Sequence, residues 1–180
     1  MVRHMASRIR VYMAASLDGF IAGPDDDLSW LPTDAKPEGD AVSFEAFMAD
    51  VGAMLMGRRT YDVVQSFGGD WPYGATPVLV ATRRPLEPAA PTVRSIEGSI
   101  DALLDQALDE ADGRDVYLDG GGMIRAALEV GRVDELIITY APILLGNGIR
   151  LFDTLTTRRP LVFEQHAKYG SMLQVRARLA

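Results

Sequence analysis

The chain has 180 residues, enough for one domain with a sizeable core, and its 48% hydrophobic and 24% charged residues are ordinary for a globular protein. Its net charge of −7 argues against nucleic acid as a partner, because nucleic-acid-binding surfaces are basic. The lack of cysteine excludes a disulfide framework, a thiolate zinc site and a cysteine nucleophile, and two histidines are too few for a histidine metal site.

No apolar run approaches the roughly 18 residues of a membrane-spanning helix, and no signal-peptide pattern is visible. We therefore expect a cytoplasmic protein that binds neither a membrane nor a metal ion. Residues 1–7, MVRHMAS, look like a vector-derived leader, so we expect a single domain over residues 8–180.

The chain begins with a strand, a long loop and a helix. Residues 9–15 form an apolar strand, and residues 16–32 form a loop rich in Gly, Asp and Pro. A helix is then indicated, with Asp40 or Ser43 as its cap, by apolar residues at i, i+3, i+4 and i+7: Phe44, Phe47, Met48 and Val51.

Two short strands follow, at residues 53–56 and 78–81. Between them, a second helix begins at Gly57 and runs to about Gln65. The loop FGGDWPYGATP connects that helix to the second of these strands.

The second half of the chain continues the alternation. A third helix is capped by Ser99, and its apolar face comprises Ile100, Leu103, Leu104, Ala107, Leu108 and Ala111. A strand at residues 116–118 leads through three glycines into a helix that ends near Gly131, and another strand covers residues 136–141.

The C-terminal part begins with a Gly-Asn-Gly turn at residues 146–148. Residues 161–168 and 172–179 then form an antiparallel hairpin around Gly170. Because strands and helices alternate before this hairpin, we predict an α/β protein with three α/β/α layers and a mainly parallel central sheet.

The stretch VYLDGGGMIRAAL places Gly120, Gly121 and Gly122 between a strand and a helix. Without Cβ atoms, these residues allow a diphosphate to approach the backbone amides, and the following helix adds the positive end of its dipole. The alternative is a tight turn with close packing of the helix on the sheet. The stretch is neither a dinucleotide fingerprint nor a P-loop, because Arg125 stands where the last glycine would fall and no Lys-Ser/Thr pair follows.

Two other strand ends carry arginine pairs, in Gly57-Arg58-Arg59-Thr60 and in Thr82-Arg83-Arg84. Ligands bind beyond the carboxyl ends of parallel strands, and arginine near the ribose is typical of NADP sites. Two charge-assisted hydrogen bonds of ~1.5–3 kcal/mol each would favour NADPH over NADH by roughly a hundredfold or more. The alternative is that these arginines lie on solvated basic turns.

Five motifs occur along the chain: AASLDGFIAGPDDDLSWL, LMGRRTYD, VLVATRRP, YLDGGGMI and LIITYAPILLGNGIRLF. Together they resemble the dihydrofolate reductase-like superfamily over nearly the whole chain. They are most similar to the reductase domain of the riboflavin-pathway deaminase–reductase and its stand-alone relatives. The resemblance implies a dihydrofolate reductase-like fold, NADPH as hydride donor and a homodimer.

By motif position, the resemblance implies cofactor contacts from Ala15, Ile21, Gly57, Arg58, Arg59, Thr60, Thr82, Arg83, Arg84, Gly120, Gly121, Gly122, Met123 and Ile124. Among them, Thr82 and Arg83 fall where the adenosine 2′-phosphate is held. Trp30 resembles the loop tryptophan of dihydrofolate reductases, although it can equally be a loop anchor.

The resemblance also implies substrate contacts from Trp30, Ser43 and Phe47. When Phe47 is aligned with the substrate-facing helix aromatic, Ser43 stands where dihydrofolate reductases carry an acid, which argues against dihydrofolate as the substrate. Asp18, in SLDG, is the candidate substrate anchor or proton relay, and its alternative role is that of an Asp-Gly turn residue.

The expected reaction is hydride transfer from NADPH to a C=N carbon of a small ribosylamino-pyrimidine-like or pterin-like substrate, with residues 16–32 as a lid. This resembles 5-amino-6-(5-phosphoribosylamino)uracil reductase of riboflavin biosynthesis. The chain lacks the H-x-E and P-C-x-x-C signature of the zinc deaminases. The alternatives are dihydrofolate reduction, an NADPH-binding module without turnover, and reduction of a secondary-metabolite carbonyl.

Overall fold

The computed structural model describes residues 7–180, so the leader predicted at residues 1–7 lies outside the described residues apart from Ser7. The strands are β1 (Ile9–Ser16), β2 (Phe20–Ala22), β3 (Val51–Gly57), β4 (Val78–Ala81), β5 (Val93–Ile96), β6 (Asp115–Asp119), β7 (Glu135–Ala141), β8 (Ile149–Arg150), β9 (Leu161–Tyr169) and β10 (Met172–Leu179). The helices are α1 (Phe44–Ala49), α2 (Arg58–Ser66), α3 (Ile100–Glu110) and α4 (Gly121–Glu129), with a 3-10 turn, η1, at Pro24–Asp26.

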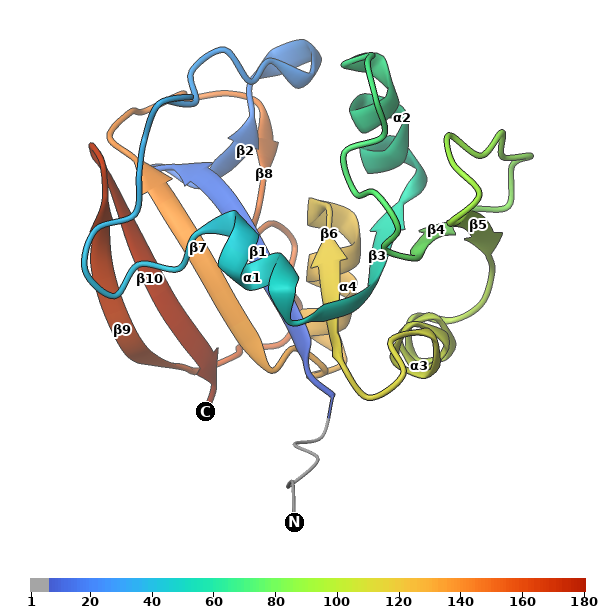
Figure 1. Cartoon of the computed structure of the whole chain (residues 1–180). Coiled ribbons are helices and arrows are strands. Elements are labelled where there is room, and N and C mark those ends of the chain that lie inside the picture. Colours follow the sequence, from blue (N-terminus) through green and yellow to red (C-terminus); the bar gives the residue numbers. More distant parts are fainter. Residues whose placement is uncertain (1–6) are drawn as a thin grey trace.

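The central sheet has eight strands in the order β5-β4-β3-β6-β1-β7-β10-β9 (Figure 1). The first six strands run parallel, and the hairpin β9–β10 adds an antiparallel edge through pairing of β10 with β7. Strands β2 and β8 form a separate two-stranded antiparallel ribbon. This arrangement confirms the predicted fold class.

Two helices cover each face of the parallel part of the sheet. Leu104 of α3 and Ile124 of α4 are fully buried in one core cluster. Phe47 of α1 and Tyr61 of α2 are fully buried in the other. In Figure 1, α1 lies in front of the sheet and α4 behind it. Each such side chain stabilises the fold by roughly 1.5–3 kcal/mol through apolar burial, and together they hold the helices in fixed positions over the strands.

Several local predictions are confirmed. The hydroxyl of Ser43, rather than the side chain of Asp40, caps α1, and the hydroxyl of Ser99 caps α3. Helix α4 ends at Glu129, and Gly131, the predicted C′ residue, has φ +73°. Its N–H donates to the Leu128 carbonyl, and the Arg132 N–H donates to the Ala127 carbonyl, which is the Schellman arrangement.

Other local predictions are wrong. Val51 does not extend the apolar stripe of α1; it begins β3 and pairs with Asp115, because the helix ends at Asp50. Strands β2, β5 and β8 were not predicted. They have two to four residues each, and β5 has only two buried positions, so neither length nor apolar pattern marks them in the sequence.

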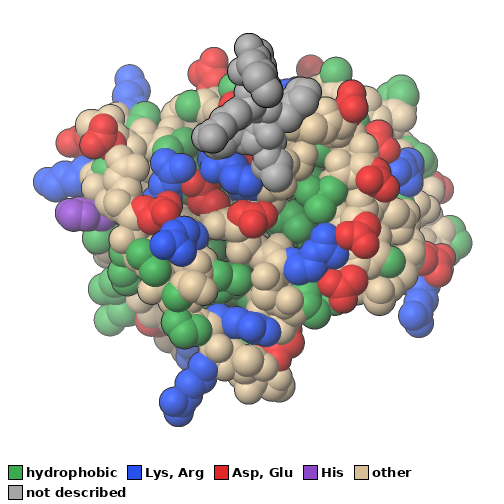
Figure 2. Space-filling view, turned by 90° about the horizontal axis from the view of Figure 1, so that it is seen from below, with side chains coloured by type: hydrophobic (Ala, Val, Ile, Leu, Met, Phe, Trp, Pro, Cys, Tyr) green, Lys and Arg blue, Asp and Glu red, His purple; other side chains and the backbone are tan. Residues whose placement is uncertain are grey.

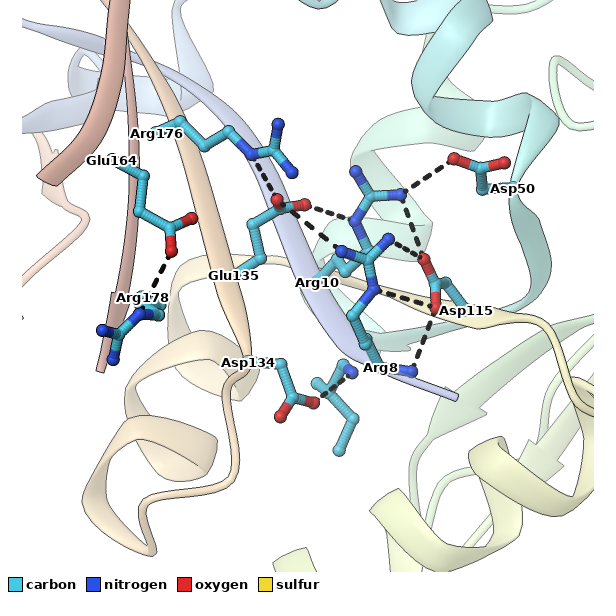
Figure 3. A network of polar contacts seen from close by, with 10 residues as sticks. Arg8, Arg10, Asp50, Asp115, Asp134, Glu135, Glu164, Arg176 and Arg178 are labelled. Atoms are coloured by element: carbon cyan, nitrogen blue, oxygen red, sulfur yellow. Dashed lines mark hydrogen bonds and ion pairs between the residues drawn. The ribbon is translucent and has the colours of Figure 1, made fainter. Parts of the chain in front are cut away.

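A buried ionic network lies at the amino ends of the parallel strands. Arg10, which is 4% exposed, bonds to Glu135 at 2.5 Å and to Asp115 at 3.1 Å. Arg8 bonds to Asp115 at 2.7 Å, and Arg176 bonds to Glu135 (Figure 3). Figure 2, which views this end of the molecule, shows acidic and basic side chains interspersed across it. The opposite end of the sheet has a different character.

Candidate functional site

The candidate site is formed by the loops that follow the carboxyl ends of β1, β3, β4 and β6, at the upper edge of the sheet in Figure 1. Gly57 at the end of β3 pairs with Ala81 of β4, and Met56 pairs with Asp119 at the end of β6. The segments GRRT, TRRP and DGGG, which are distant in sequence, therefore lie at one edge, as predicted.

The three glycines have different reasons to be glycine. Gly120 has φ +90°, and a Cβ atom there would overlap the Thr60 hydroxyl. A Cβ on Gly121 would lie 3.1 Å from Ile21 Cδ1 and 2.9 Å from Arg125 Nη1. Gly122 is exposed, and within the described residues no heavy atom lies within 4 Å of the position its Cβ would take. Packing therefore accounts for the first two glycines but not for the third.

The helices that begin at this edge differ from the others in their caps. In α1 and α3, the hydroxyls of Ser43 and Ser99 accept backbone hydrogen bonds of 3.0 and 3.3 Å. The caps of α2 and α4 are Gly57 and Gly120, and no side chain among residues 7–180 caps either helix. The first N–H groups of α2 and α4 are thus free for an anionic ligand.

These two helix starts are neighbours in space. Met123 Cγ lies 3.6 Å from the position that a Cβ on Gly57 would occupy, and the side chain of Thr60 packs against Gly120. Both positive dipole ends therefore point toward the same part of the edge, as a diphosphate site requires.

The four predicted arginines are not equivalent. Arg58 donates to Asp62 and to the Pro85 carbonyl, both at 2.7 Å, so it braces the loop after β4. Arg59 bonds to Asp26 of η1 at 3.0 Å, and Arg84 lies 3.4 Å from Asp62. Arg83 is exposed and forms no hydrogen bond or ion pair with any described residue. Arg83 is therefore the arginine that is available to a phosphate without breaking an existing contact.

Other predicted cofactor residues support the turns rather than offering side chains. The Thr82 hydroxyl accepts a 3.0 Å hydrogen bond from the Arg84 N–H. Ala15 and Ile124 are fully buried in the core cluster beneath α3 and α4, so their side chains present no surface to a ligand. Ile21 is partly exposed and packs beside Gly121, next to the glycine turn.

The substrate-side prediction for Phe47 needs correction. Its ring is fully buried against Tyr12, Tyr117 and the guanidinium of Arg10, so it cannot touch a substrate in this structure. Phe44, one turn earlier on α1, is 41% exposed and is the aromatic side chain that a ligand can reach. The position predicted to face the substrate therefore lies on the buried face of α1. Ser43 is engaged as the α1 cap.

Asp18 is a loop anchor. Its carboxylate accepts hydrogen bonds from the Ser16 hydroxyl at 2.6 Å, the Leu145 N–H at 3.1 Å and the Gly146 N–H at 2.8 Å. The Ser16 hydroxyl, followed by these amides, lowers the pKa of Asp18 to about 2. The carboxylate is therefore ionised at neutral pH and is poorly suited to donate a proton. It ties the loop after β1 to the Gly-Asn-Gly loop.

Trp30 is half-buried in the loop that follows η1. Its indole N–H donates to the Asp27 carbonyl at 3.0 Å, within the same loop. This contact fits the anchor alternative, and a contact between Trp30 and a bound nicotinamide or substrate stays a prediction.

Asp119 is a functional candidate that the sequence reasoning missed. It ends β6 directly before the glycines, is 8% exposed, and lies on the same face of the sheet as Tyr117. Burial raises its pKa to about 6, against the effect of the 2.8 Å hydrogen bond from the Gly120 N–H. The available signal was a carboxylate that ends the apolar run VYLD at the glycine turn.

No group of three His, Cys, Asp or Glu side chains among the described residues could hold a metal ion. Across residues 7–180, none of the helices is long and apolar enough to cross a membrane.

Comparison with known families identifies the family of the chain. A family described as the RibD C-terminal domain matches residues 7–175. The chain belongs to this family. A relative in Bacillus subtilis (strain 168), the uncharacterized protein YwjB, is 30% identical over 172 residues, covering 95% of this chain and 97% of its own. As a RibD-type reductase domain, the chain is placed among the oxidoreductases.

Solved structures show the same fold. One is a "putative riboflavin biosynthesis protein" from Shewanella sp. PV-4, which is 31% identical with a TM-score of 0.83. The match covers 96% of this chain and 99% of that protein. The Thermotoga maritima diaminohydroxyphosphoribosylaminopyrimidine deaminase/5-amino-6-(5-phosphoribosylamino)uracil reductase is 15% identical with a TM-score of 0.69. The match covers 97% of this chain but 57% of that bifunctional protein, and it shows the fold alone.

Proposed function

We propose that the protein is an NADPH-dependent reductase that transfers a hydride to a C=N carbon of a small heterocyclic substrate. The observation that carries this proposal is the pair of adjacent helix starts, α2 and α4, which have glycine caps and no side-chain cap among the described residues, next to the unpaired Arg83. Membership of the RibD C-terminal domain family supports the same reading.

The residues present fit NADPH. The open space at Gly122 lets a diphosphate oxygen approach the backbone, where a side chain would obstruct it. Arg83 and the Thr82 segment would hold the adenosine 2′-phosphate, and Ile21 would border the nicotinamide. NADPH supplies the hydride when bound, and the protein supplies orientation and a site with little water.

Asp119 is the proton source in this proposal. Reduction of C=N adds a hydride to carbon and a proton to nitrogen. With a pKa of about 6, the Asp119 carboxyl is partly protonated near neutral pH, as a general acid requires. Burial raises the pKa of Tyr73, and the charge of Asp119 raises it further. Tyr73 therefore lies near Asp119, and the aromatic loop around it borders the same region.

The substrate class follows from the side chains around Asp119. Phe44 is exposed beside Tyr117, with ring centroids 6.1 Å apart, and offers a surface to a planar ring. The Ser43 hydroxyl accepts the capping hydrogen bond of α1, and position 43 has no carboxylate that could bind the pterin ring of dihydrofolate. A ribosylamino-pyrimidine-like substrate is therefore favoured over dihydrofolate.

Cofactor titration tests the proposal. Binding of NADPH and of NADH is measured by tryptophan fluorescence, and independently by calorimetry, for the wild type and for Arg83→Gln. We expect micromolar NADPH binding, much weaker NADH binding, and a loss of roughly tenfold or more in NADPH affinity in the variant. Arg158→Gln is the control, because Arg158 is also an exposed arginine with no partner among the described residues. Folded protein that binds neither nucleotide would refute the reductase proposal.

We also propose that the protein is a homodimer that pairs through the outer hairpin. Phe163, Leu161 and Leu173 are 72%, 40% and 45% exposed, and the β9–β10 register places them on one face of the sheet. Exposed apolar residues on one face of a long edge hairpin are typical of an interface. Light scattering should give twice the 19.6 kDa of one chain, and Phe163→Lys should give the monomer. A wild-type mass of one chain would contradict the dimer.

A further inference from the structure

We propose a second oxyanion site, suited to a phosphate group, in a hollow of about 310 Å³ between α4 and the β2–β8 ribbon. Its lining includes Phe20, Arg125, Asn147, Arg150 and Asp153. None of these residues belongs to the segments that we assign to NADPH, so the site is an addition to the proposed function and does not depend on it.

Arg150 is the first anchor of this site. Its guanidinium carbon lies 4.5 Å from the ring centroid of Phe20, whose side chain is buried. Stacking on a ring uses the face of the guanidinium and leaves its N–H groups free in the plane. Arg150 is exposed and forms no ion pair with any described residue. The ring therefore holds a cation in a fixed orientation with its donors available.

Arg125 is the second anchor. Its Nη1 donates to the Arg150 carbonyl at 2.7 Å and to the Leu151 carbonyl at 3.4 Å, which fixes the side chain against β8. Its Nε and Nη2 groups have no partner within residues 7–180, so three N–H donors remain. Two guanidiniums from separate elements thus border one hollow.

The charge of the hollow favours an anion. Nine arginines form ion pairs among the described residues, but Arg125 and Arg150 are not among them. Asp153 is the single carboxylate in the lining, so two cations face one anion. The two guanidiniums that line this one hollow give it a net positive charge, which favours an anionic ligand.

The hollow lies on the opposite side of the glycine turn from the α2 start. A Cβ on Gly121 would be 2.9 Å from Arg125 Nη1 and 3.4 Å from the Arg150 carbonyl, whereas Thr60 packs against Gly120. A phosphate bound between the two arginines therefore occupies a position distinct from the free amides at Gly122. The two positions can be separated by experiment.

Isothermal titration calorimetry tests the site. Inorganic phosphate and ribose 5-phosphate are titrated into the protein, with and without saturating NADPH. We expect binding that persists with NADPH and weakens tenfold or more in Arg150→Gln, but stays within twofold in Arg83→Gln and in the control Arg158→Gln. Tighter binding of ribose 5-phosphate than of inorganic phosphate would identify a sugar phosphate as the ligand, and equal binding would identify the free anion.

Either of two kinds of result would overturn the proposal: no binding, or binding at another place. One is the absence of phosphate binding by folded protein. The other is binding that Arg150→Gln leaves unchanged, or that NADPH and Arg83→Gln both abolish, because the phosphate would then occupy the cofactor segments. Since the titrations without NADPH use the same variants, a failure of NADPH binding alone would leave this test valid.

Discussion

Asp115 and Asp119 are both on β6, four residues apart on the same face of the sheet, and each is 8% exposed. Asp115, at the amino end, accepts from Arg8 at 2.7 Å and from Arg10 at 3.1 Å. Asp119, at the carboxyl end, has the Gly120 N–H as its donor, and no cation among the described residues pairs with it. Equal burial has produced a paired charge at one end and a carboxyl with a raised pKa at the other.

The two ends of the sheet therefore use buried charge differently. At the amino end, every buried carboxylate of the network has a guanidinium, which holds β1, β6 and β7 in register (Figure 3). At the carboxyl end, a carboxyl lacks a cation, two helices lack side-chain caps within residues 7–180, and Arg83 lacks an acid. Unsatisfied groups gathered at one edge are typical of a ligand site.

The largest effect is expected from Asp115→Asn. The change removes the buried carboxylate that pairs with both Arg8 and Arg10, and Arg10, which is 4% exposed, keeps Glu135 as its close partner. Breaking a buried pair typically destabilises a protein by about 3–5 kcal/mol. Urea unfolding should report a loss of that size. The control Asp101→Asn, which breaks an exposed pair with Arg132, should cost under about 1 kcal/mol. Equal losses of unfolding free energy in the two variants would show that the buried pair stabilises the fold no more than the exposed pair.

Asp119→Asn should change how stability depends on pH. The folded pKa, about 6, lies above the unfolded value of 3.8, so the native state binds more protons between these values and wild-type stability falls as pH rises through them. The fall amounts to about 3 kcal/mol and is complete above pH 6. The variant lacks this fall, so its stability relative to wild type should increase by that amount between pH 4 and 7. A constant difference would show that Asp119 is not perturbed.

The same variant should lose turnover. If Asp119 supplies the proton, Asp119→Asn should lower kcat by roughly a hundredfold or more while NADPH affinity stays within twofold. The measurement is NADPH oxidation with a ribosylamino-pyrimidine phosphate. Full turnover in the variant would assign the proton to water instead.

The smallest effect on stability is expected from Gly122→Ala. Because the position is helical and open, alanine should stabilise the fold by up to about 1 kcal/mol, yet it should weaken NADPH binding by obstructing the backbone. Gly120→Ala should instead destabilise the protein, since it combines φ +90° with overlap of Thr60. Unchanged NADPH affinity in Gly122→Ala would make the third glycine a turn residue only.

Much of the fold was predictable from local patterns. Apolar periodicity identified α3, whose face of Leu103, Leu104 and Ala107 is buried. The hairpin β9–β10 was marked by Gly170 ahead of an alternating run at residues 172–179. The convergence of GRRT, TRRP and DGGG was predictable because carboxyl ends of parallel strands share an edge. Three properties were not predictable: the burial of Phe47, the hydrogen bonds that Asp18 accepts, and the absence of a partner for Arg83 among the described residues. Each depends on segments that are distant in sequence.

The sequence by itself determined the alternation of strands and helices, the family and the edge at which the ligand segments meet, because these follow from local periodicity and from motifs in order. The tertiary structure alone decided which groups remain unsatisfied there. Burial around β6 raises the pKa of Asp119, and amides near residue 145 bind the carboxylate of Asp18. Gly122 stays open because no described residue packs over it. Such properties arise from desolvation and contact, which are defined only when the whole chain has folded.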